Sequence, residues 1–567
     1  MDFKKQLVSF LSTVIDLPET EIFPSIEIPP DSKLGDFAFP CFKLAKELKK
    51  APNIIAQEFA DKISSQLPEF LEETRSTGAF LNFFLNKKFF AGLIINNILQ
   101  SGQAYGTSTI GEDRTIVLDF SSPNVAKRFH IGHLYSTVIG GALYKMYNFL
   151  GFKSFGINYL GDWGTQFGKL IVAYKNWGDK SLIEQNGIEE IERLYVMFHD
   201  KAEVDSSLED EARSWLVKMQ NYDPEAISIW KLLCDISVEE YEKQYKRLHI
   251  HFDSYLGESF YNDKMRAVVD ELIEKNLLKE SDGAQIVDLE AYNHPPCLIL
   301  RKDGGALYPT RDIASVIYRK NTYNFYKAVY VTDIRQSLHF AQWFKVIGLM
   351  GYDWETDLVH VPYGLLSLED GALSSRKGKV LLLTDILDEA VRRISVIIEE
   401  KNPNLENKDT VAEQVGIGAV IFSALYNSRI KDNVISLDKI LSFEGETGPY
   451  IQYTHARTAG VLEKAGISGI PTDVDFSALT DEASFETIKL LADYQNRVLL
   501  AVKRFEPFLI ARYLIALSQT FNKFYHDNSI LSSEPAVKNA RLALVFSVKT
   551  VLSSGLALLG ISAPDKM

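Results

Sequence analysis

Cysteine is scarce in this chain of 567 residues. The three cysteines, Cys41, Cys234 and Cys297, lie far apart and form no Cys-x-x-Cys pair. This spacing argues against a disulfide scaffold and against a zinc-ribbon site, and we predict no metal-binding residues in the chain. We accordingly expect a protein of a reducing compartment, the cytoplasm.

Long apolar runs and several common catalytic motifs are missing as well. The chain has no apolar stretch of 18 residues without a charged residue, so we expect neither a membrane span nor a membrane partner. The opening segment, MDFKKQLVSFLSTVIDL, lacks the apolar core and cleavage site of a signal peptide. The absence of G-x-x-x-x-G-K-[ST] argues against a P-loop NTPase, and neither H-E-x-x-H nor G-x-S-x-G occurs.

Positive charge is in deficit, since 61 Lys and Arg residues stand against 75 Asp and Glu residues, a net charge of −14. Taken alone, this balance argues against a nucleic-acid partner. The segment from Glu184 to Glu242, however, holds 16 acidic and 5 basic residues, a net of −11, which leaves only about −3 for the rest of the chain. An acidic insertion therefore masks a nearly neutral body, and the average charge does not decide whether RNA binds.

The composition, 46% hydrophobic and 24% charged, is that of an ordinary globular protein, and the length predicts three to five domains. We expect a compact α+β module over residues 1–110 and a domain with β/α alternation over residues 111–371. That domain carries mostly helical insertions at about 170–235 and 260–305. Residues 372–567 are expected to begin with a loop and then to form an all-α bundle.

The β/α alternation is clearest between residues 114 and 160. Arg114–Phe120 has the apolar, β-branched pattern of a buried strand, and a polar loop separates it from a helix pattern that starts at His130. Lys153–Leu160 is the next predicted strand. A strand–loop–helix–strand unit of this kind is typical of a doubly wound parallel sheet, a Rossmann-like α/β fold. The alternation resumes with the predicted strands Ala328–Ile334 and Leu358–Leu366.

The strongest chemical signal is His130-Ile131-Gly132-His133, at the turn between the first strand and its helix. In a doubly wound sheet this turn presents a helix N-terminus to phosphates. Gly132 would let a nucleotide approach the backbone, and imidazoles three residues apart share one helical face and can donate to phosphate oxygens. A pair of surface histidines, or half of a metal site, would have the same spacing.

A second signal is the basic loop Leu373–Lys379, LSSRKGK, which follows a predicted strand. Basic side chains there could clamp a triphosphate and close over it during the reaction. In isolation the loop is better interpreted as a solvated basic turn. Its occurrence in the same α/β frame as the histidine motif favours the catalytic interpretation.

With these motifs in view, the chain resembles the class I aminoacyl-tRNA synthetases and, within them, the arginyl-tRNA synthetase family. The motif SPNVAKRFHIGHL resembles that family's extended HIGH region. Further blocks that resemble family signatures are GDWGTQFG, LYPTRDIA, DIRQSLHFAQ and SFEGETGPYIQYTHAR, together with KLGDFAF and TGAFLNFFLN near the N-terminus. The likeness extends over nearly the whole chain, and it implies a D-loop-contacting domain at 1–110 and an anticodon-binding bundle in 372–567.

The resemblance implies ligation of L-arginine to its cognate tRNA in two steps. The arginine carboxylate attacks the α-phosphorus of ATP, and the adenylate then passes the arginyl group to a 2′-hydroxyl of the tRNA. The family generally needs tRNA for the first step. We expect ATP with Mg²⁺ as a substrate, no tightly bound cofactor and a monomeric enzyme. No editing domain is apparent, since a site that satisfies a whole guanidinium rejects smaller amino acids at binding.

The resemblance also implies roles for individual residues. It assigns the chemical step to His130, His133, Lys127, Arg376 and Lys377, and ATP binding to His130, Gly132, His133, Ser374, Ser375 and Lys377. It assigns the amino and carboxylate ends of arginine to Asp119, Ser121 and Asn124, the guanidinium to Asp312 with Tyr308 beside it, and a further arginine contact to Gln336. A carboxylate suits the five-donor guanidinium fork. Outside this family context, a helix-start carboxylate with a packed tyrosine would be the simpler interpretation of Asp312 and Tyr308.

For tRNA, the resemblance points to residues that are aromatic, amide-bearing or basic, as RNA bases stack on such side chains. They are Phe80 and Asn82 for the D-loop, and Tyr450, Tyr453, Arg457, Tyr525 and Met567 for the anticodon. Tyrosines at helical spacing usually pack in a core, so that interpretation stays open for each of them.

Two positions depart from the family pattern. The lysines of the usual KMSKS loop correspond here to Ala372 and Ser375, so positive charge on the triphosphate must come from elsewhere. Lys127 resembles the lysine that substitutes for it, with Arg376 and Lys377 as competitors. Arg128 stands where the family usually has proline or a small residue, which affects at most the rigidity of the loop.

Three alternatives remain at this stage. The chain could be a class I synthetase for cysteine, glutamate or lysine, although the zinc-binding cysteines of a cysteine enzyme are absent. A small-molecule nucleotidylyltransferase shares the histidine motif but needs neither the N-terminal module nor the long helical region. A non-catalytic tRNA-binding relative would not be expected to retain His130, His133 and Asp312.

Overall fold

The strand β4 (Thr115–Asp119) lies at the centre of the main sheet, and its sequence explains why. Ile116, Val117 and Leu118 are buried without alternation, the pattern of a parallel strand covered on both faces. The computed structural model describes residues 3–369, 382–466 and 474–567. In this part of the chain β4 pairs in parallel with β5 (Lys153–Ile157) and with β9 (Lys327–Asp333).

The main sheet has the order β10-β9-β4-β5, with β10 (Leu358–Tyr363) parallel to β9. The chain leaves β4 toward β5 on one side and returns on the other side as β9, so the direction of winding reverses between β4 and β9. Ligands in open parallel sheets bind outside the carboxyl ends of the strands at such a switch point. The predicted doubly wound parallel sheet is confirmed, with the helix α6 (Ile131–Phe149) between β4 and β5.

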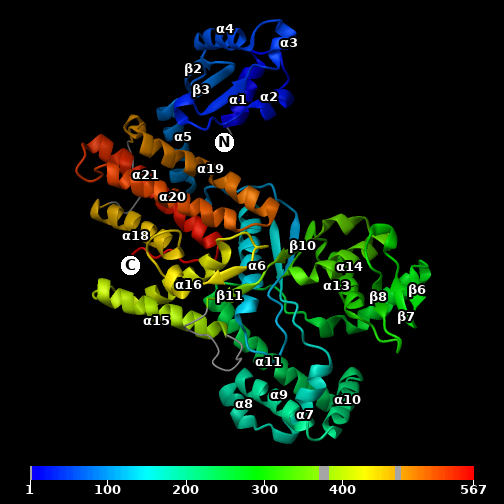
Figure 1. The fold of residues 1–567 in the computed structure, drawn as a ribbon. Helices are drawn as coiled ribbons and strands as arrows, with labels where there is room; N and C mark the ends of the chain where they lie inside the picture. Colours follow the sequence, from blue (N-terminus) through cyan, green and yellow to red (C-terminus); the bar gives the residue numbers. More distant parts are fainter. Residues whose placement is uncertain (1–2, 370–381, 467–473) are drawn as a thin grey trace. The chain divides into compact units, whose positions relative to one another are not determined.

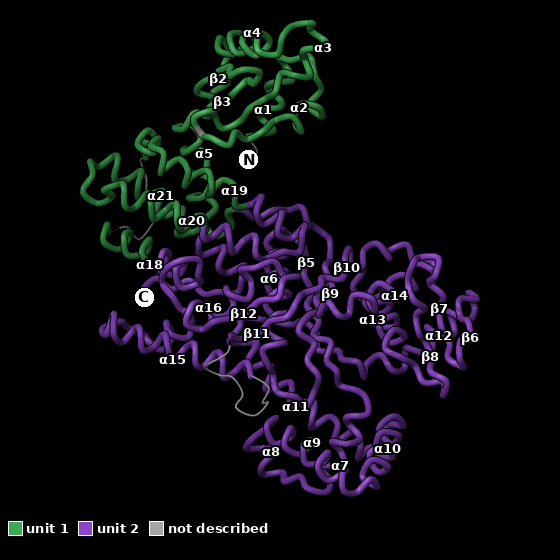
Figure 2. The backbone as a smooth tube through the Cα atoms, in the orientation of Figure 1, with its two compact units in different colours: residues 1–105, 457–494, 516–551 green, residues 106–456, 495–515, 552–567 purple. Residues whose placement is uncertain are grey.

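The chain divides into two compact units (Figure 2). One contains residues 1–105, 457–494 and 516–551, and the other contains residues 106–456, 495–515 and 552–567. The domain boundaries expected at 110 and 371 stay predictions.

The first unit contains an antiparallel sheet of the order β1-β3-β2. Its strands are β1 (Phe37–Pro40), β2 (Leu71–Thr77) and β3 (Phe80–Leu85), and its helices are α1 (Phe3–Ser12), α2 (Glu19–Ser25), α3 (Leu44–Leu48), α4 (Pro52–Ser64) and α5 (Lys87–Ser101). Four long helices have residues in both units: α18 (Gly448–Lys464), α19 (Glu482–Arg504), α20 (Phe508–Asp527) and α21 (Pro535–Leu558).

The second unit holds the main sheet and everything inserted into it. After β5 come α7 (Thr165–Trp177), α8 (Lys180–Asn186), α9 (Ile188–Ala202), α10 (Ser207–Gln220), α11 (Pro224–Arg247), α12 (Met265–Glu274), β6 (Leu278–Ser281), β7 (Ala284–Val287), β8 (Cys297–Leu300) and α13 (Tyr308–Tyr323). The remaining elements are α14 (Ser337–Leu349), β11 (Leu366–Leu368), α15 (Leu383–Lys401), α16 (Lys408–Leu425), β12 (Asn433–Ile435) and α17 (Leu437–Ile440).

Helices predominate in the inserted region as expected, but the second insertion also contains strands that the sequence pattern did not predict. Helices α7–α11 form the first insertion, whereas residues 278–300 form the antiparallel sheet β6-β7-β8 (Figure 1). The reason lies in a short hairpin, because Ser281 and Ala284 pair across Asp282 and Gly283, both at positive φ. The C-terminal region is not purely helical either, since β12 pairs in parallel with β11.

Among the described residues, α21 is the one helix that is long and apolar enough to cross a membrane. Of its most apolar 18-residue window, 72% is buried inside the structure. The buried core helix of a folded protein meets the same criterion of length and composition.

Helix α6 lies close against the end of β4, and Gly140 makes this approach possible. A Cβ at position 140 would lie 2.2 Å from Cγ of Phe120, the buried residue that follows β4. No larger residue fits there unless the helix or the strand end moves.

We therefore expect Gly140→Ala to lower the free energy of unfolding by about 1–3 kcal/mol, the usual cost of overpacking. The midpoint of thermal unfolding should fall accordingly. Gly460→Ala, in the interior of α18, is the matched control, because a Cβ there meets no atom within 4 Å. It should leave the midpoint unchanged or raise it, since alanine is the better helix former. Scanning calorimetry of both variants makes the comparison, and equal midpoints would contradict the packing argument.

Candidate active site

A cavity of about 500 Å³ opens at the carboxyl ends of β4, β9 and β10. All six residues predicted to bind arginine line it, together with His133: Asp119, Ser121, Asn124, Tyr308, Asp312 and Gln336. These residues come from β4, the loop after it, α13 and the turn after β9. The topology of the sheet therefore brings together segments that are distant in sequence, as the switch point predicts.

The loop between β4 and α6, here called the signature loop (residues 120–130), has an uncommon backbone. Ser121, Ser122 and Ala126 have φ values of 69°, 49° and 64°, in the left-handed region. Non-glycine residues pay a steric cost there, so such a loop keeps its shape only where its surroundings hold it. The Ser121 amide donates to Oγ of Ser136, at 2.9 Å, and the Ser122 amide donates to Oδ1 of Asn158, at 3.1 Å.

The two histidines form the N-terminal cap of α6. Nδ1 of His130 accepts a hydrogen bond from the Gly132 amide, at 3.0 Å, and Nδ1 of His133 accepts one from the His130 amide, at 3.2 Å. Because both Nδ1 atoms accept, the proton of each neutral ring sits on Nε2. The sequence motif thus fixes the tautomer of both imidazoles and leaves Nε2–H as the donor of each ring.

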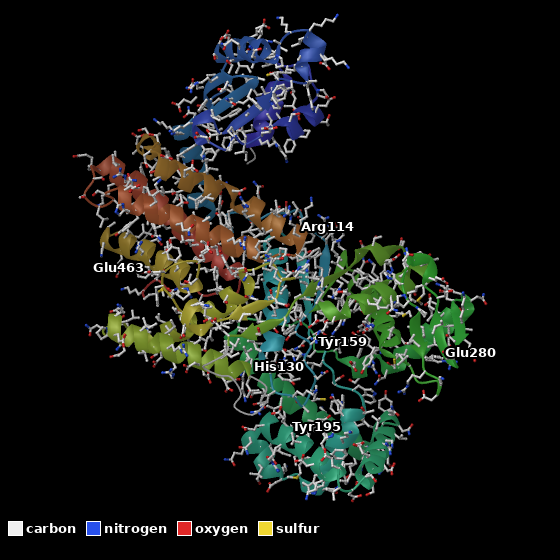
Figure 3. All side chains as sticks on the ribbon, viewed as in Figure 1. Arg114, His130, Tyr159, Tyr195, Glu280 and Glu463 are labelled. Carbon is white, nitrogen blue, oxygen red and sulfur yellow. The ribbon has the colours of Figure 1, made fainter. Side chains whose placement is uncertain are left out.

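Burial keeps both rings neutral. It lowers the pKa of His133 to about 3, with His130 and Lys127 as further causes. Burial and then the charge of Lys127 also lower the pKa of His130. The His130 side chain at the start of α6 is labelled in Figure 3.

The structure gives a reason for glycine at position 132 that the sequence motif does not reveal. A Cβ there would lie 2.8 Å from Cε1 of His130. The missing side chain therefore makes room for the His130 ring to fold back over the helix start. The nucleotide contact predicted for Gly132 stays a prediction.

Asp119 at the end of β4 forms a buried ion pair. Its Oδ2 accepts from Nη1 of Arg319 on α13, at 2.8 Å, and its Oδ1 accepts from Ser122, at 3.0 Å. The two charged side chains are 7% and 1% exposed. Burial raises the pKa of Asp119 against the lowering effect of Arg319. Both carboxylate oxygens therefore have partners within the protein.

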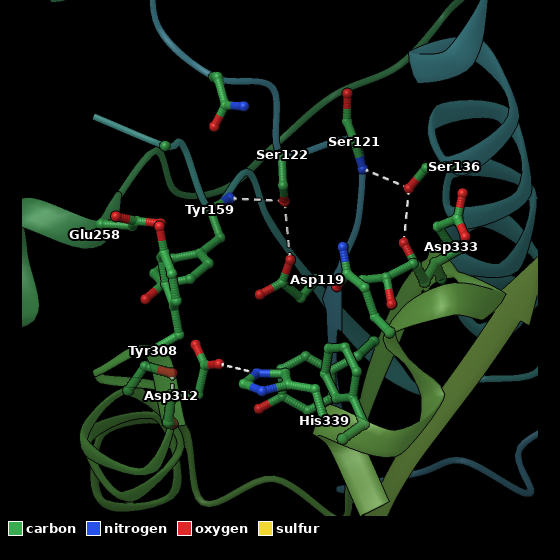
Figure 4. A pocket seen from close by; sticks show the side chains of 18 of the residues that line it. Asp119, Ser121, Ser122, Ser136, Tyr159, Glu258, Tyr308, Asp312, Asp333 and His339 are labelled. Carbon is green, nitrogen blue, oxygen red and sulfur yellow. Dashed lines mark hydrogen bonds and ion pairs between the residues drawn. The ribbon is translucent and has the colours of Figure 1, made fainter. Parts of the chain in front are cut away.

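Asp312 and Glu258 place two acidic side chains in the cavity (Figure 4). Oδ2 of Asp312 lies 2.6 Å from Nε2 of His339 on α14. Glu258, in the 3₁₀ turn Glu258–Lys264, accepts from Nη1 of Arg311 at 2.7 Å. Burial raises the pKa of Glu258 to about 7; Arg311 lowers it, and the neighbouring charges of Asp312 and Asp162 raise it. Tyr308, one helical turn before Asp312, is 66% exposed at the mouth of the site.

Sequence reasoning missed four residues that shape this cavity: Tyr159, Glu258, His339 and Arg319. His339 lies inside the quoted block DIRQSLHFAQ, three residues after Gln336, so that motif could have indicated it. Tyr159 lies at the carboxyl end of the predicted strand Lys153–Leu160, where site residues of parallel sheets gather. Glu258 and Arg319 carry no local signal that separates them from other charged residues.

The basic loop lies outside the described residues, and with it Ala372, Ser374, Ser375, Arg376 and Lys377. Their predicted roles stay predictions. The chain that follows is held at the signature loop, because Leu382 bridges to His130 and the Leu383 amide donates to the carbonyl of Phe129, at 2.9 Å.

Arg128, the departure from the family pattern, contacts the acidic insertion. Its guanidinium bonds to Glu192 of α9 and lies 3.7 Å from Glu189. Arg128 thus ties the signature loop to the first insertion.

Over the described ranges, no group of three or more His, Cys, Asp or Glu side chains is arranged to hold a metal ion.

The residues predicted to contact tRNA lie in both units. In the first unit, Phe80 meets Phe42 edge-on at 5.7 Å, and Asn82 is only 3% exposed. Arg457 donates to Asn522 at 2.5 Å and lies over the ring of Tyr525. In the second unit Tyr450 lies on α18, and Tyr453 and Met567 line a separate cavity of about 600 Å³.

The buried neutral His133 predicts a specific pH dependence of stability. The unfolded chain binds a proton at this residue near its ordinary pKa of about 6.5, whereas the folded chain does so only near 3. Stability is therefore lost as pH falls below about 6.5. His133→Asn keeps an acceptor for the His130 amide but cannot titrate. Its unfolding midpoint relative to the unmodified protein should rise between pH 7.5 and pH 5.

The control for this measurement is Gly460→Ala, because it removes no ionisable group and its Cβ meets no atom within 4 Å. Its midpoint relative to the unmodified protein should not change with pH. A His133→Asn difference that is equally constant would show that this ring is not held neutral by burial.

Comparison with known proteins agrees with this geometry. A family model for the class I (R) tRNA synthetase catalytic domain matches residues 94–437. Models for the arginyl tRNA synthetase N-terminal domain and the DALR anticodon binding domain match residues 1–85 and 451–567.

Whole-chain relatives give the same result. The arginine–tRNA ligases of Alkaliphilus metalliredigens and Halothermothrix orenii are 54% and 53% identical over the full length of both chains. The solved structure of Thermus thermophilus arginyl-tRNA synthetase covers 96% of each chain with a TM-score of 0.78 at 26% identity. The chain therefore belongs to the arginyl-tRNA synthetase family of class I enzymes.

Proposed function

We propose that this enzyme ligates L-arginine to its cognate tRNA through an arginyl-adenylate. A carboxylate oxygen of arginine attacks the α-phosphorus of ATP, the bond to the β-phosphate oxygen breaks and pyrophosphate leaves. The 2′-hydroxyl of the terminal adenosine then attacks the arginyl carbonyl, AMP leaves and the hydroxyl proton is released. The observation that supports this most is the pair of cavity carboxylates, Glu258 and Asp312, beside a helix start capped by two neutral histidines.

The cavity suits a long side chain that ends in a cation. Glu258 and Asp312 supply negative charge from two separate elements, and Tyr308 offers an aromatic face and a hydroxyl. Arg311 and His339 each bind one oxygen of these two carboxylates, whereas both oxygens of Asp119 are engaged, by Arg319 and Ser122. We infer that Asp312 and Glu258 bind the guanidinium, while Ser121, Asn124, Gln336 and the region of Asp119 hold the amino and carboxylate ends.

Buried polar atoms without partners support a polar ligand at this site. The Tyr159 hydroxyl and Nε1 of Trp343 have no hydrogen-bond partner among the described residues, and both side chains line the cavity. Such groups are costly unless a ligand or water satisfies them.

The histidine cap is suited to the phosphate chain of ATP. Neutral imidazoles that donate from Nε2 can bind oxygens whose negative charge grows during the displacement. We infer that His130 and His133 stabilise this charge together with the start of α6 and Lys127. Lys127 lies close enough to lower the pKa of both rings. ATP brings Mg²⁺ as part of the substrate, and we propose no resident cofactor.

The tRNA-binding residues named above complete the proposal. Phe80 and Asn82 are assigned to the D-loop, and Tyr450, Tyr453, Arg457, Tyr525 and Met567 to the anticodon. We further propose that the enzyme acts as a monomer in the cytoplasm, and that tRNA is required for adenylate formation.

ATP–pyrophosphate exchange tests this function directly. We expect exchange with arginine, and only after the cognate tRNA is added. The control series replaces arginine with glutamate, lysine or cysteine. Strong exchange with one of these would instead indicate another class I specificity, and exchange that depends on a different small-molecule acceptor, with neither amino acid nor tRNA present, would point to a nucleotidylyltransferase.

Glu258 predicts how arginine binding depends on pH. A guanidinium stabilises the ionised carboxylate, whose pKa in the empty cavity is about 7. Arginine affinity should therefore reach its maximum above pH 7. As the pH drops below 7 the affinity should fall, with a limiting slope of roughly tenfold per pH unit. The KM for arginine in the exchange assay, measured from pH 6 to 8, checks this. Glu258→Gln should have a raised KM that is nearly flat over this range.

Asp312→Asn is the matched comparison. It keeps the shape of the side chain but removes a charge that faces the guanidinium, which should weaken arginine recognition by about 2–5 kcal/mol and leave the KM for ATP nearly unchanged. Since the charge of Asp312 also raises the pKa of Glu258, the pH midpoint should move down. An unchanged KM for arginine would refute the assignment.

A further inference from the structure

Helix α11 of the first insertion presents a row of three hydroxyl groups to the signature loop. Ser237, Tyr241 and Tyr245 are spaced four residues apart, so they lie on one face of the helix. All three are buried, with exposures of 0%, 0% and 2%. Hydroxyls in a core are retained at a cost unless they make specific hydrogen bonds.

Each of the three hydroxyls contacts this loop. The Tyr241 hydroxyl lies 2.7 Å from the carbonyl oxygen of Lys127 and 2.8 Å from that of Asn124, and it shares its single proton between them. Oγ of Ser237 accepts from the Ala126 amide at 3.0 Å. The Tyr245 hydroxyl lies 2.9 Å from Oγ of Ser121.

The contacts fall where the loop is strained. Ala126, at φ 64°, lies between the two carbonyls that Tyr241 binds, and Ser121, at φ 69°, contacts Tyr245. A left-handed alanine is unfavourable by about 1–2 kcal/mol relative to an ordinary conformation. The free loop would therefore relax, and the hydroxyl row opposes that relaxation.

The helix is itself anchored on both sides of the row. Near its start, Nε1 of Trp230 donates to the carbonyl of Asp162 at 2.7 Å. At its end, Arg247 binds Asp388 of α15 at 2.7 Å and Glu413 of α16 at 2.8 Å. A helix fixed at two places can hold a neighbouring loop in one conformation.

We propose that α11 positions the signature loop for the chemical step, with Tyr241 as the positioning residue that fixes the backbone of Lys127. This inference rests on the proposed adenylation chemistry. In this role Tyr241 touches no substrate. Its hydroxyl holds the main chain on both sides of Ala126, so that the Lys127 ammonium and the histidine cap keep a fixed relation.

Tyr241→Phe removes one hydroxyl and keeps the ring. In tRNA-supported exchange with arginine, we expect kcat to fall roughly 10- to 100-fold, the scale of a small misplacement at a reacting centre. The KM values for ATP and arginine should stay within about twofold, because the ground-state contacts are retained. Tyr147→Phe, at the other end of α6 and also buried, is the control, with unchanged kcat expected.

A double-mutant cycle identifies the route of the effect. If Tyr241 acts through Lys127, Tyr241→Phe should reduce kcat much less in a Lys127→Ala background than in the unmodified enzyme. Fully additive losses would overturn the inference, and so would an unchanged kcat in Tyr241→Phe. A lower unfolding midpoint together with raised KM values for both ATP and arginine would show a purely structural role, and it would overturn the inference as well.

Two further results keep the outcomes separate. If the unmodified enzyme shows no arginine-dependent exchange, the proposed function fails independently of Tyr241. If Tyr241→Phe does not fold, Ser237→Ala replaces it, because it removes the acceptor of the Ala126 amide. The same selective loss of kcat is then expected, and normal kcat in a folded Ser237→Ala enzyme would overturn the inference.

Discussion

The buried ion pair between Asp119 and Arg319 is the contact on which the site depends. It joins the carboxyl end of the central strand to helix α13, across 200 residues of sequence. Breaking such a pair leaves an uncompensated charge in the interior, which typically costs about 3–5 kcal/mol. Because α13 also carries Asp312 and Tyr308, the pair fixes where the acidic side of the cavity lies relative to the signature loop.

The electrostatics of the site divide into two regions with different tasks. Around Glu258 and Asp312 the cavity is acidic, which suits a cation. At the start of α6 the rings are held neutral by burial, with their Nδ1 atoms occupied by the backbone. A neutral Nε2–H group can donate to a phosphate oxygen whose negative charge grows during the reaction. It avoids the desolvation cost of a buried imidazolium ion. The two regions lie at the carboxyl ends of neighbouring parallel strands, so one small cavity can hold a cationic amino acid next to a phosphate.

The first insertion is more than an acidic addition to the sheet. Arg128 reaches Glu192 on α9, and the hydroxyls of α11 hold the strained backbone around Ala126. Much of the net charge that argued against RNA therefore belongs to helices that shape the signature loop. This explains how a chain with a net charge of −14 is compatible with a tRNA-binding family.

Local pattern by itself predicted the strands of the main sheet and the helix that starts at the histidine motif, and the family resemblance of short motifs pointed to Asp119, Asn124, Asp312 and Gln336. Apolar runs, helix starts and short motifs are properties of neighbouring residues, so they can be read along the chain. The tertiary structure alone decided that Glu258 lines the same cavity as Asp312, that Arg319 neutralises Asp119, and that Gly132 makes room for an imidazole. It also decided that the second insertion contains a sheet. These outcomes depend on burial and on contacts between distant segments, and a charged residue gives the same local signal whether it will face water or a buried partner.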